Sequence, residues 1–227
     1  MALVGDNGAG KSTLMKVLAG AHAADEGQFF IDEAAVNVDN PHDATSLGIQ
    51  IVYQDLALCE NLDVAANLSL GAEPVKPGWR FLPRLLRPLD ELAMEVKAQQ
   101  AINRLQVRTL RSVRAKVGGL SGGQRQAIAI ARAVGTDSTV VMLDEPTAAL
   151  GVAQTRQVLD MVKRLRDTNH AVIYISHNMR DIFEVADRIC VLRHGANVAT
   201  WKASDTTTDE VVVAMTRGLD DDAPQAA

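Results

Sequence analysis

The chain has 227 residues, of which 47% are hydrophobic, and it carries a net charge of -5. This length and apolar content allow one large core, with room for a smaller inserted subdomain. The negative charge and the absence of a long basic block weigh against a protein whose main affinity is for a nucleic-acid backbone, so we expect no nucleic-acid partner.

Neither a membrane span nor a secretory signal is expected. No run of the sequence approaches the roughly 18 consecutive apolar residues that cross a bilayer, and the first residues lack the basic stretch and apolar core of a signal peptide. We therefore expect a soluble, cytosolic chain. Cys59 and Cys190 lie far apart in apolar runs, which favours reduced core residues over a disulfide or a metal site.

The first half of the chain predicts short strands and one early helix. Residues 2–4 are predicted to end a strand, and residues 12–19 to form a helix. Further strands are predicted at 28–31, 36–38 and 49–53. Prolines and arginines then gather at 73–88 and interrupt regular structure. This segment is the best candidate for an insertion or a subdomain boundary.

Helices and strands alternate in the second half. Helices are predicted over 89–105, after Ser121, over 154–165 and over 211–215, and strands over 139–143, 171–175, 188–192 and 197–201. Residues 207–210 fit a capping box before the last helix, and residues 219–227 fit a frayed acidic tail. The fully apolar strands indicate an α/β fold with a mostly parallel sheet flanked by helices.

A phosphate-binding loop, Gly5-Asp6-Asn7-Gly8-Ala9-Gly10-Lys11-Ser12, matches the pattern G-x-x-x-x-G-K-[ST]. Its glycines let backbone N–H groups turn toward phosphate oxygens, Lys11 reaches the outer phosphates, and the Ser12 hydroxyl can ligate Mg²⁺. The helix that follows adds the positive end of its dipole. A glycine-rich turn that happens to contain Lys-Ser is the weaker alternative, because a strand precedes the loop and a helix follows it.

Two adjacent carboxylates, Asp144 and Glu145, follow the apolar strand at 139–143. A parallel sheet delivers them to its carboxyl edge, where the phosphate loop also lies. Neighbouring strand residues point to opposite sides, so Asp144 can hold Mg²⁺ while Glu145 orients and deprotonates a water molecule. Acids that merely cap a helix are the alternative, which the phosphate loop makes weaker.

Three further motifs lie at element ends. Gln54 ends the strand at 49–53, and His177 follows the strand at 171–175, although a lone histidine there is more often a capping or packing residue. The segment Leu120-Ser121-Gly122-Gly123-Gln124 opens a helix and can present N–H groups and a hydroxyl to phosphate. By itself, such a turn is ordinary.

In this order, the phosphate loop, Gln54, residues 120–124, the acid pair and His177 resemble the ATP-binding cassette family over nearly the whole chain. The resemblance implies a P-loop NTPase fold with an inserted helical subdomain. The core would comprise residues 1–54 and 125–218, the subdomain about 55–124, and the tail 219–227.

The resemblance also implies ATP and Mg²⁺ as ligands. The residues implied to bind nucleotide are Gly5, Asp6, Asn7, Gly8, Ala9, Gly10, Lys11, Ser12 and Thr13, with Ser121, Gly122, Gly123 and Gln124 acting on ATP held by a second cassette. Mg²⁺ would be served by Ser12, Gln54 and Asp144. Glu145 would be the catalytic base, with Gln54 beside it and His177 on the γ-phosphate.

Within the family, residues 6–10, 146–151 and 176–179 look most like single-cassette ATPase subunits of bacterial monosaccharide importers of the ribose, xylose and fructose type. This implies a homodimer at the cytoplasmic face of the membrane, docked on a transmembrane permease that a periplasmic sugar-binding protein serves. An ATPase for another solute, a soluble cassette of DNA repair or translation, and a truncated nucleotide binder with impaired hydrolysis compete with this interpretation. The DNA-repair and translation class tends to carry coiled coils, tandem cassettes or basic surfaces, which this sequence lacks.

The sequence departs from the family pattern at two places. Gly151 replaces a usual Asp, which puts that residue's contact across the dimer in doubt. Met1 lies four residues before Gly5, where members have strands and an adenine-stacking aromatic, so we expect an N-terminal truncation and weaker ATP binding; base stacking is worth roughly 1 to 3 kcal/mol. Trp79 and Phe81 are candidates for permease docking, although subdomain core is the favoured interpretation.

Overall fold

The computed structural model describes residues 1–78, 82–83, 86–107, 109–135 and 138–218. Contacts divide the chain into two compact units: unit 1 comprises residues 1–54, 138–148 and 165–227, and unit 2 comprises residues 55–137 and 149–164. The inserted subdomain expected over about 55–124 begins at the same point as unit 2. Unit 2 extends further along the chain, because the helix at 122–134 packs on the helices before it.

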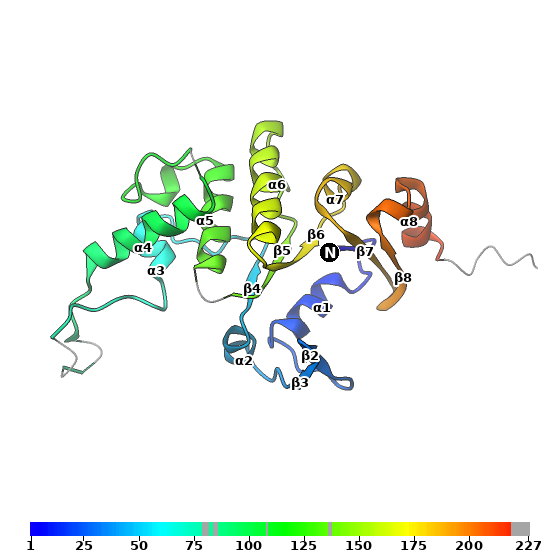
Figure 1. Ribbon diagram of the computed structural model, residues 1–227, viewed down its shortest axis with the longest axis horizontal. Helices are drawn as coiled ribbons and strands as arrows, with labels where there is room; N and C mark the ends of the chain where they lie inside the picture. The colour runs from blue at the N-terminus through cyan, green and yellow to red at the C-terminus, as the bar shows by residue number, and fades with distance from the viewer. Residues whose placement is uncertain (79–81, 84–85, 108, 136–137, 219–227) are drawn as a thin grey trace, which may run out of the picture. The chain divides into compact units, whose positions relative to one another are not determined.

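Unit 1 is built on a six-stranded sheet of order β4-β5-β6-β1-β7-β8 (Figure 1). Its strands are β1 (Ala2–Val4), β4 (Ile49–Val52), β5 (Val140–Asp144), β6 (Ala171–Ile175), β7 (Arg188–Arg193) and β8 (Ala196–Lys202). All neighbours pair in parallel except β7 and β8, which form an antiparallel hairpin. The predicted α/β class with a mostly parallel sheet is confirmed.

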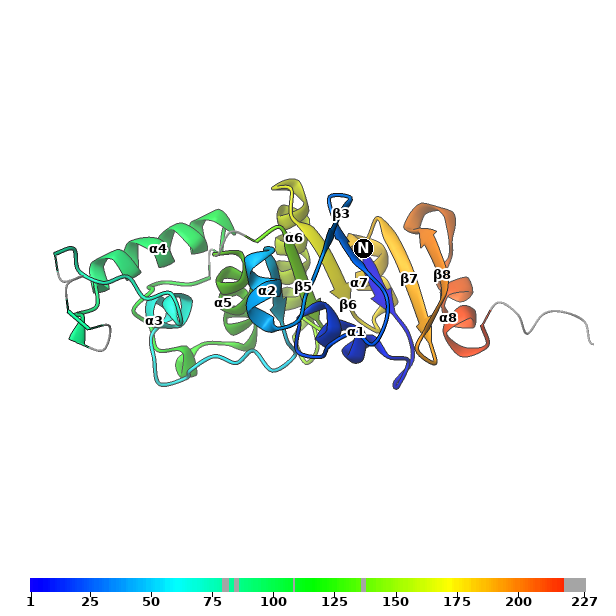
Figure 2. The same ribbon diagram turned by 90° about the horizontal axis from the view of Figure 1, so that it is seen from below.

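Helices cover both faces of this sheet. In unit 1 they are α1 (Lys11–Leu18), α2 (Pro41–Ser46), α7 (Met179–Val185) and α8 (Thr208–Thr216), with a 3-10 turn at Ala203–Asp205. Figures 1 and 2 show α1 and α2 on one face and α7 and α8 on the other. Beneath α1, the apolar side chains of Leu3, Met15, Met142, Ile175 and Leu192 form one buried cluster. Apolar strand residues therefore meet apolar helix residues, which explains why the strands show no polar alternation.

Unit 2 is helical. It contains α3 (Val64–Ser69), α4 (Glu91–Arg104), a 3-10 turn at Val117–Gly119, α5 (Gly122–Val134) and most of α6 (Val152–Asp167). Its core gathers residues from α3, α4, α5 and the loop between α4 and α5, namely Val64, Ala65, Ala98, Val113, Val117 and Ile128. Across the described ranges of both units, none of the helices combines the length and the apolar character that crossing a membrane requires.

One predicted strand is wrong in position. The hairpin consists of β2 (Phe29–Ile31) and β3 (Ala34–Val36), so the second strand lies two residues before the predicted 36–38. Its two-residue turn is Asp32-Glu33, with φ of 48° and 66°. Both residues adopt the left-handed conformation that such tight hairpin turns require. Because neither is glycine or asparagine, the usual sequence signal of this turn is missing.

The short helices α2, α3 and α7 are absent from the prediction. They have six, six and seven residues, too few for a helical period to be recognised. Each nevertheless begins at a capping side chain: Asn40, Asp63 and Asn178 accept hydrogen bonds from backbone N–H groups of the first turn. The capping box predicted at 207–210 is confirmed, because Thr207 and Glu210 bond reciprocally at the start of α8.

One prediction for unit 1 concerns Gly20, which follows α1 with φ of +69° and whose missing side chain leaves room for the backbone of Asn40. We expect Gly20→Ala to lower the free energy of unfolding by about 3 kcal/mol, since a left-handed alanine is strained and its Cβ would collide with the Asn40 carbonyl. Gly71→Ala is the matched control, with φ of +84° and nothing within 4 Å. Urea unfolding of both variants measures the difference, and equal losses would contradict the collision.

Candidate functional site

The phosphate loop joins β1 to α1 in the order predicted from the sequence. Gly8 and Gly10 have φ of 81° and 101°, and Gly10 caps α1 without any side-chain hydrogen bond to the first turn. Backbone N–H groups at this helix start are therefore not capped by a side chain, which is the arrangement that receives an anion. The hydroxyl-bearing side chains of Ser12 and Thr13 are exposed beside it.

Lys11 folds back over the loop. Its Nζ donates to the backbone oxygens of Gly5 at 2.7 Å and of Asp6 at 3.1 Å. The Asp6 carboxylate accepts from the N–H of Asn7 at 2.7 Å, and the Asp6 carbonyl accepts from the N–H of Ala9 at 3.1 Å. Hydrogen bonds within the loop therefore fix its shape, and the Lys11 ammonium group is bonded to two of the loop's carbonyl oxygens.

The hairpin of β7 and β8 packs against this loop. Gly195 donates its N–H to the carbonyl of Ala9 at 3.0 Å, and a Cβ on Gly10 would lie 3.3 Å from the Cα of Gly195. A Cβ on Gly5 would collide with the carbonyl of Leu192. Glycine is needed at Gly5 and Gly10 for close backbone approach, in addition to any contact with phosphate.

The predicted catalytic and metal residues lie at the carboxyl edge of the same sheet. Four neighbouring strands bring these residues to this edge. Gln54 follows β4, Asp144 ends β5 and Glu145 follows it, His177 follows β6, and the phosphate loop follows β1. The Glu145 Oε1 and His177 Nδ1 atoms are 2.9 Å apart. The side chain of Glu145 is 16% exposed and that of His177 is 75% exposed. The lone histidine therefore contacts the second acid directly, and Gln54 is exposed two strands away.

Asp144 is half-buried between two charged neighbours. Burial raises the pKa of Asp144, the carboxylate of Glu145 raises it further, and the ammonium of Lys11 lowers it. The net direction is upward, so folding disfavours the charged form of this carboxyl group relative to water. A divalent cation bound beside Asp144 would favour its ionised form.

Within the described residues, no three His, Cys, Asp or Glu side chains cluster as a metal site would require. The ligand set expected for Mg²⁺ differs in kind, since Ser12, Gln54 and Asp144 contribute a hydroxyl, an amide and one carboxylate. Oxygen ligands of this type suit Mg²⁺, which keeps several waters and binds few protein groups. The donor chemistry of these residues fits the ion.

The segment predicted to open a helix near residue 121 starts α5 in unit 2. The Ser121 Oγ accepts from the N–H of Gln124 at 3.4 Å, and the Gln124 Oε1 accepts from the N–H of Ser121 at 2.9 Å, which completes a capping box. The Gln124 Nε2 donates to the carbonyl of Thr109 at 2.7 Å. A Cβ on Gly123 would lie 2.9 Å from Cγ of Gln154.

Sequence reasoning assigned no role to four further residues near Asp144 and Glu145. The side chains of Tyr174, Thr147 and Asp181 form a hydrogen-bonded chain, and Asn178 caps α7. A cap-like asparagine three residues before an aspartate was a readable signal for α7, whereas Thr147 carries no signal of its own. Burial raises the pKa of Tyr174 to about 12.

Other predictions concern residues away from this edge. Cys190 packs against the core of unit 1, but Cys59 is exposed, so the expectation that both cysteines lie in a core is wrong for Cys59. Cys59 lies in the loop before α3, so the apolar run around it does not form a buried strand or helix. Trp79, Phe81 and residues 219–227 lie outside the described residues.

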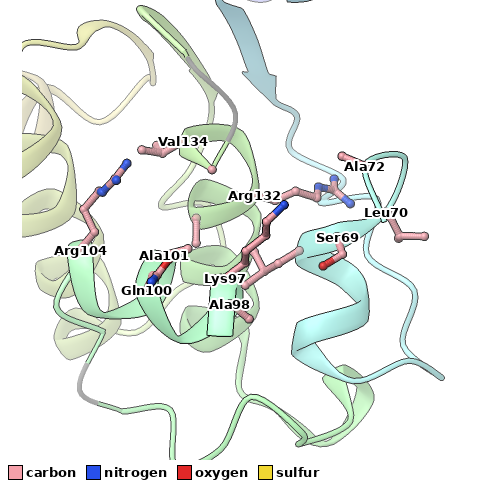
Figure 3. A pocket seen from close by; sticks show the side chains of 13 residues that line it. Ser69, Leu70, Ala72, Lys97, Ala98, Gln100, Ala101, Arg104, Arg132 and Val134 are labelled. Atoms are coloured by element: carbon pink, nitrogen blue, oxygen red, sulfur yellow. The ribbon is translucent and has the colours of Figure 1, made fainter. Parts of the chain in front are cut away.

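Unit 2 contains a pocket of 240 Å³ bounded by α4, the end of α3 and the end of α5 (Figure 3). Its lining includes the apolar residues Ala98, Ala101 and Val134 and the basic residues Lys97, Arg104 and Arg132. The guanidinium of Arg132 donates to the carbonyls of Ala57 and Leu56 at 2.9 and 3.1 Å, which holds it at one side of the pocket.

Comparison with known proteins identifies the family. The model of the ABC transporter family matches residues 1–148. The chain belongs to the ABC transporter family. The fructose import ATP-binding protein of Rhizobium meliloti is 42% identical over 216 residues, which cover 95% of this chain and 82% of that protein. A xylose/arabinose import ATP-binding protein of Sulfolobus acidocaldarius is 39% identical with the same coverage.

As a member of this family, the chain is an ABC-type ATPase that binds nucleotide. A ribose import ATP-binding protein of Escherichia coli O157:H7 is 41% identical, with 94% of this chain matching 40% of that protein. Among solved structures, a nucleotide-free ATP-binding cassette from an ABC transporter superposes with a TM-score of 0.74 at 25% identity, covering 88% of this chain and 79% of that one. These matches confirm the resemblance drawn from the motifs.

The raised pKa of Asp144 generates a prediction for the chain without nucleotide or metal. At pH 7 the folded state holds a partly buried carboxylate that the unfolded state solvates fully, so Asp144→Asn should raise the melting temperature. Because the folded pKa lies above the unfolded value, the gain should shrink as the pH falls toward the unfolded value of about 4 and the parent carboxyl takes up a proton. Thermal melts at both pH values measure it, with Asp25→Asn, at an exposed aspartate, as the control; a lower melting temperature at pH 7 would contradict it.

Proposed function

We propose that this chain is the ATP-hydrolysing subunit of a bacterial importer that takes up a simple sugar. The observation that carries the proposal is the 2.9 Å contact between Glu145 and His177 at the sheet edge where the phosphate loop also begins. Relatives named as fructose and xylose/arabinose import ATP-binding proteins support sugar uptake, since both match over 95% of the chain.

Residues 5–13 would hold the phosphates of ATP. The uncapped start of α1 supplies N–H donors, and Lys11 would exchange its bonds to the Gly5 and Asp6 carbonyls for the outer phosphates. Ser12, Gln54 and Asp144 would hold Mg²⁺. The bound cation would neutralise charge on the phosphate oxygens during hydrolysis.

Glu145 would take the proton from the attacking water. Its carboxylate is mostly shielded, lies at the strand end beside Asp144, and contacts the exposed imidazole of His177. When Glu145 is ionised, the His177 Nδ1–H donates to it, and the Nε2 atom can donate to the γ-phosphate when the imidazole carries a proton on both nitrogens. The two residues would therefore orient each other as well as the reacting groups.

A second cassette would complete each site. Ser121, Gly122, Gly123 and Gln124 lie at the start of α5 in unit 2, and the family arrangement would apply them to ATP held by the partner chain. Ser121 and Gln124 already cap the helix mutually, which leaves the helix start rigid. A homodimer would contain two such sites, with the charge contact usually made by an Asp at position 151 absent.

The partner in the membrane would be a permease, and the unit 2 pocket is its proposed docking point (Figure 3). A lining of apolar residues with three basic side chains suits a short cytoplasmic helix that presents apolar residues and an acidic residue or a free carbonyl end. The chain would accordingly lie at the cytoplasmic face of the bacterial membrane, with a periplasmic sugar-binding protein acting on the permease from the other side.

The catalytic assignment predicts that Glu145→Gln lowers ATP turnover by about a hundredfold or more, because a general base contributes that much and the amide cannot accept the proton. Binding of ATP should persist, since Glu145 does not belong to the phosphate loop. Phosphate release and equilibrium ATP binding are the measurements. Glu26→Gln, at an exposed glutamate of the same unit, is the control, and turnover of Glu145→Gln at the parent rate would contradict the role.

The docking assignment predicts that Ala101→Trp uncouples the transporter. The indole would fill a pocket of 240 Å³, so stimulation of ATP hydrolysis by the permease and sugar uptake should both fall at least about tenfold, a loss of roughly 1.4 kcal/mol in coupling. The chain is co-reconstituted with the permease of its importer, and uptake of ribose, xylose and fructose is compared. Gln99→Trp, at an exposed α4 position that does not line the pocket, is the control. Full stimulation of the Ala101 variant would contradict this docking site.

A further inference from the structure

Thr147 lies in a tight turn that carries Glu145. The turn is closed by the Ala148 N–H, which donates to the Glu145 carbonyl at 3.0 Å, and it is joined to β6 by the Glu145 N–H, which donates to the Ile175 carbonyl at 2.9 Å. Glu145 itself has φ of 47°. A left-handed glutamate is strained, so the surroundings must hold this backbone in place.

The hydroxyl of Thr147 links this turn to two buried groups. Its Oγ1 donates to the Asp181 Oδ2 at 2.9 Å and lies 3.3 Å from the Tyr174 hydroxyl. A threonine hydroxyl has one proton, so when it donates to Asp181 the Tyr174 hydroxyl must be the donor of the second bond. The raised pKa of Tyr174 is consistent with this, because the phenol keeps its proton at neutral pH.

The two groups flank His177 along the chain. Tyr174 lies three residues before His177 in β6, and Asp181 lies four residues after it in α7. Between them, the N–H of Asn178 donates to the Ser176 Oγ at 3.1 Å. His177 lies in the connection between β6 and α7. The Thr147 hydroxyl bonds to a residue at each end of this connection and so links it to the turn that contains Glu145.

Burial makes these bonds costly to lose. Tyr174 is 1% exposed and Asp181 is 4% exposed, whereas the side chain of His177 is 75% exposed. A buried hydroxyl or carboxylate left without its partner loses the hydrogen bond and cannot recover it from water. The contact between the shielded Glu145 and the exposed His177 is thus supported by two partly buried hydrogen bonds to Tyr174 and Asp181.

We propose that Thr147 is a positioning residue that holds Glu145 and His177 at hydrogen-bond distance by bonding to Tyr174 and Asp181. The proposal rests on the proposed function, in which Glu145 is the catalytic base. Thr147 itself touches no reacting atom in this assignment. It acts through the backbone of the 145–148 turn and through the two ends of the His177 connection.

The test compares Thr147→Val, which keeps the shape and removes the hydroxyl, with Thr147→Ser, which keeps the hydroxyl. A displacement of the base by about 1 Å can cost a hundredfold in rate, so we expect kcat for ATP hydrolysis to fall about ten- to a hundredfold in Thr147→Val. ATP affinity should be unchanged, and Thr147→Ser should recover most of kcat. All assays are run below the melting temperature of each variant, so that loss of fold and loss of rate are separated.

Tyr174→Phe and Asp181→Asn provide the second arm. Each alters one end of the hydrogen-bonded chain with little change in volume, and we expect smaller losses of kcat, again without loss of ATP affinity. If Thr147→Val does not fold, this pair of variants carries the test. Parent kcat in folded Thr147→Val, or in both second-arm variants, overturns the proposal, as does a serine variant as slow as the valine variant.

Glu145→Gln separates this proposal from the function on which it rests. Turnover at the parent rate in Glu145→Gln contradicts the catalytic base, whatever the Thr147 variants do. An inactive Glu145→Gln together with a fully active Thr147→Val contradicts only the positioning role. Low activity of both, with ATP binding retained in both, supports the proposal.

Discussion

The parallel register of β5, β6 and β1 is the constraint on which the candidate site depends. Asp144 pairs with Ile175, and Leu3 pairs with the same residue from the other side. Three strands therefore end together, and the residues that follow them leave the sheet at one edge. A slip of one residue between β5 and β6 would turn each side chain to the opposite face. It would also separate the turn of Glu145 from the connection that holds His177.

Two residues at the end of β5 are held in unfavourable states, and burial of apolar side chains in the same strand offsets this cost. Asp144 is held in surroundings that disfavour its negative charge. Glu145 has a left-handed backbone conformation, which is strained for any residue that carries a Cβ. Immediately before them, Met142 and Leu143 are fully buried in the sheet. Burying such side chains is worth roughly 1.5 to 3 kcal/mol each. The rigid middle of β5 thereby supports strained and partly desolvated groups at its end, as is expected where function conflicts with local preference.

Sequence reasoning located the elements and motifs whose signals are local. Apolar runs predicted β5 and β6, and the glycine pattern predicted the loop before α1. The position of β3 was missed because its turn uses Asp32 and Glu33 in place of glycine. The contact of Glu145 with His177 follows from the fold, since 32 positions separate the two residues. Thr147 shows why some site residues cannot be read from sequence: its role depends on two partners that only tertiary packing brings to it.

The loop around Gly151 takes its shape from the packing of its neighbouring residues and not from a charged side chain at 151. A Cβ on Gly123 would lie 2.9 Å from the Cγ of Gln154, and a Cβ on Gly122 would lie 3.3 Å from a methyl of Leu150. The Gln154 Oε1 also accepts from the N–H of Gly151 at 3.4 Å. Residues on both sides of Gly151 are therefore placed by packing against the start of α5. An acidic side chain at 151 is not needed to shape this loop, because packing on both sides of Gly151 supports the backbone path.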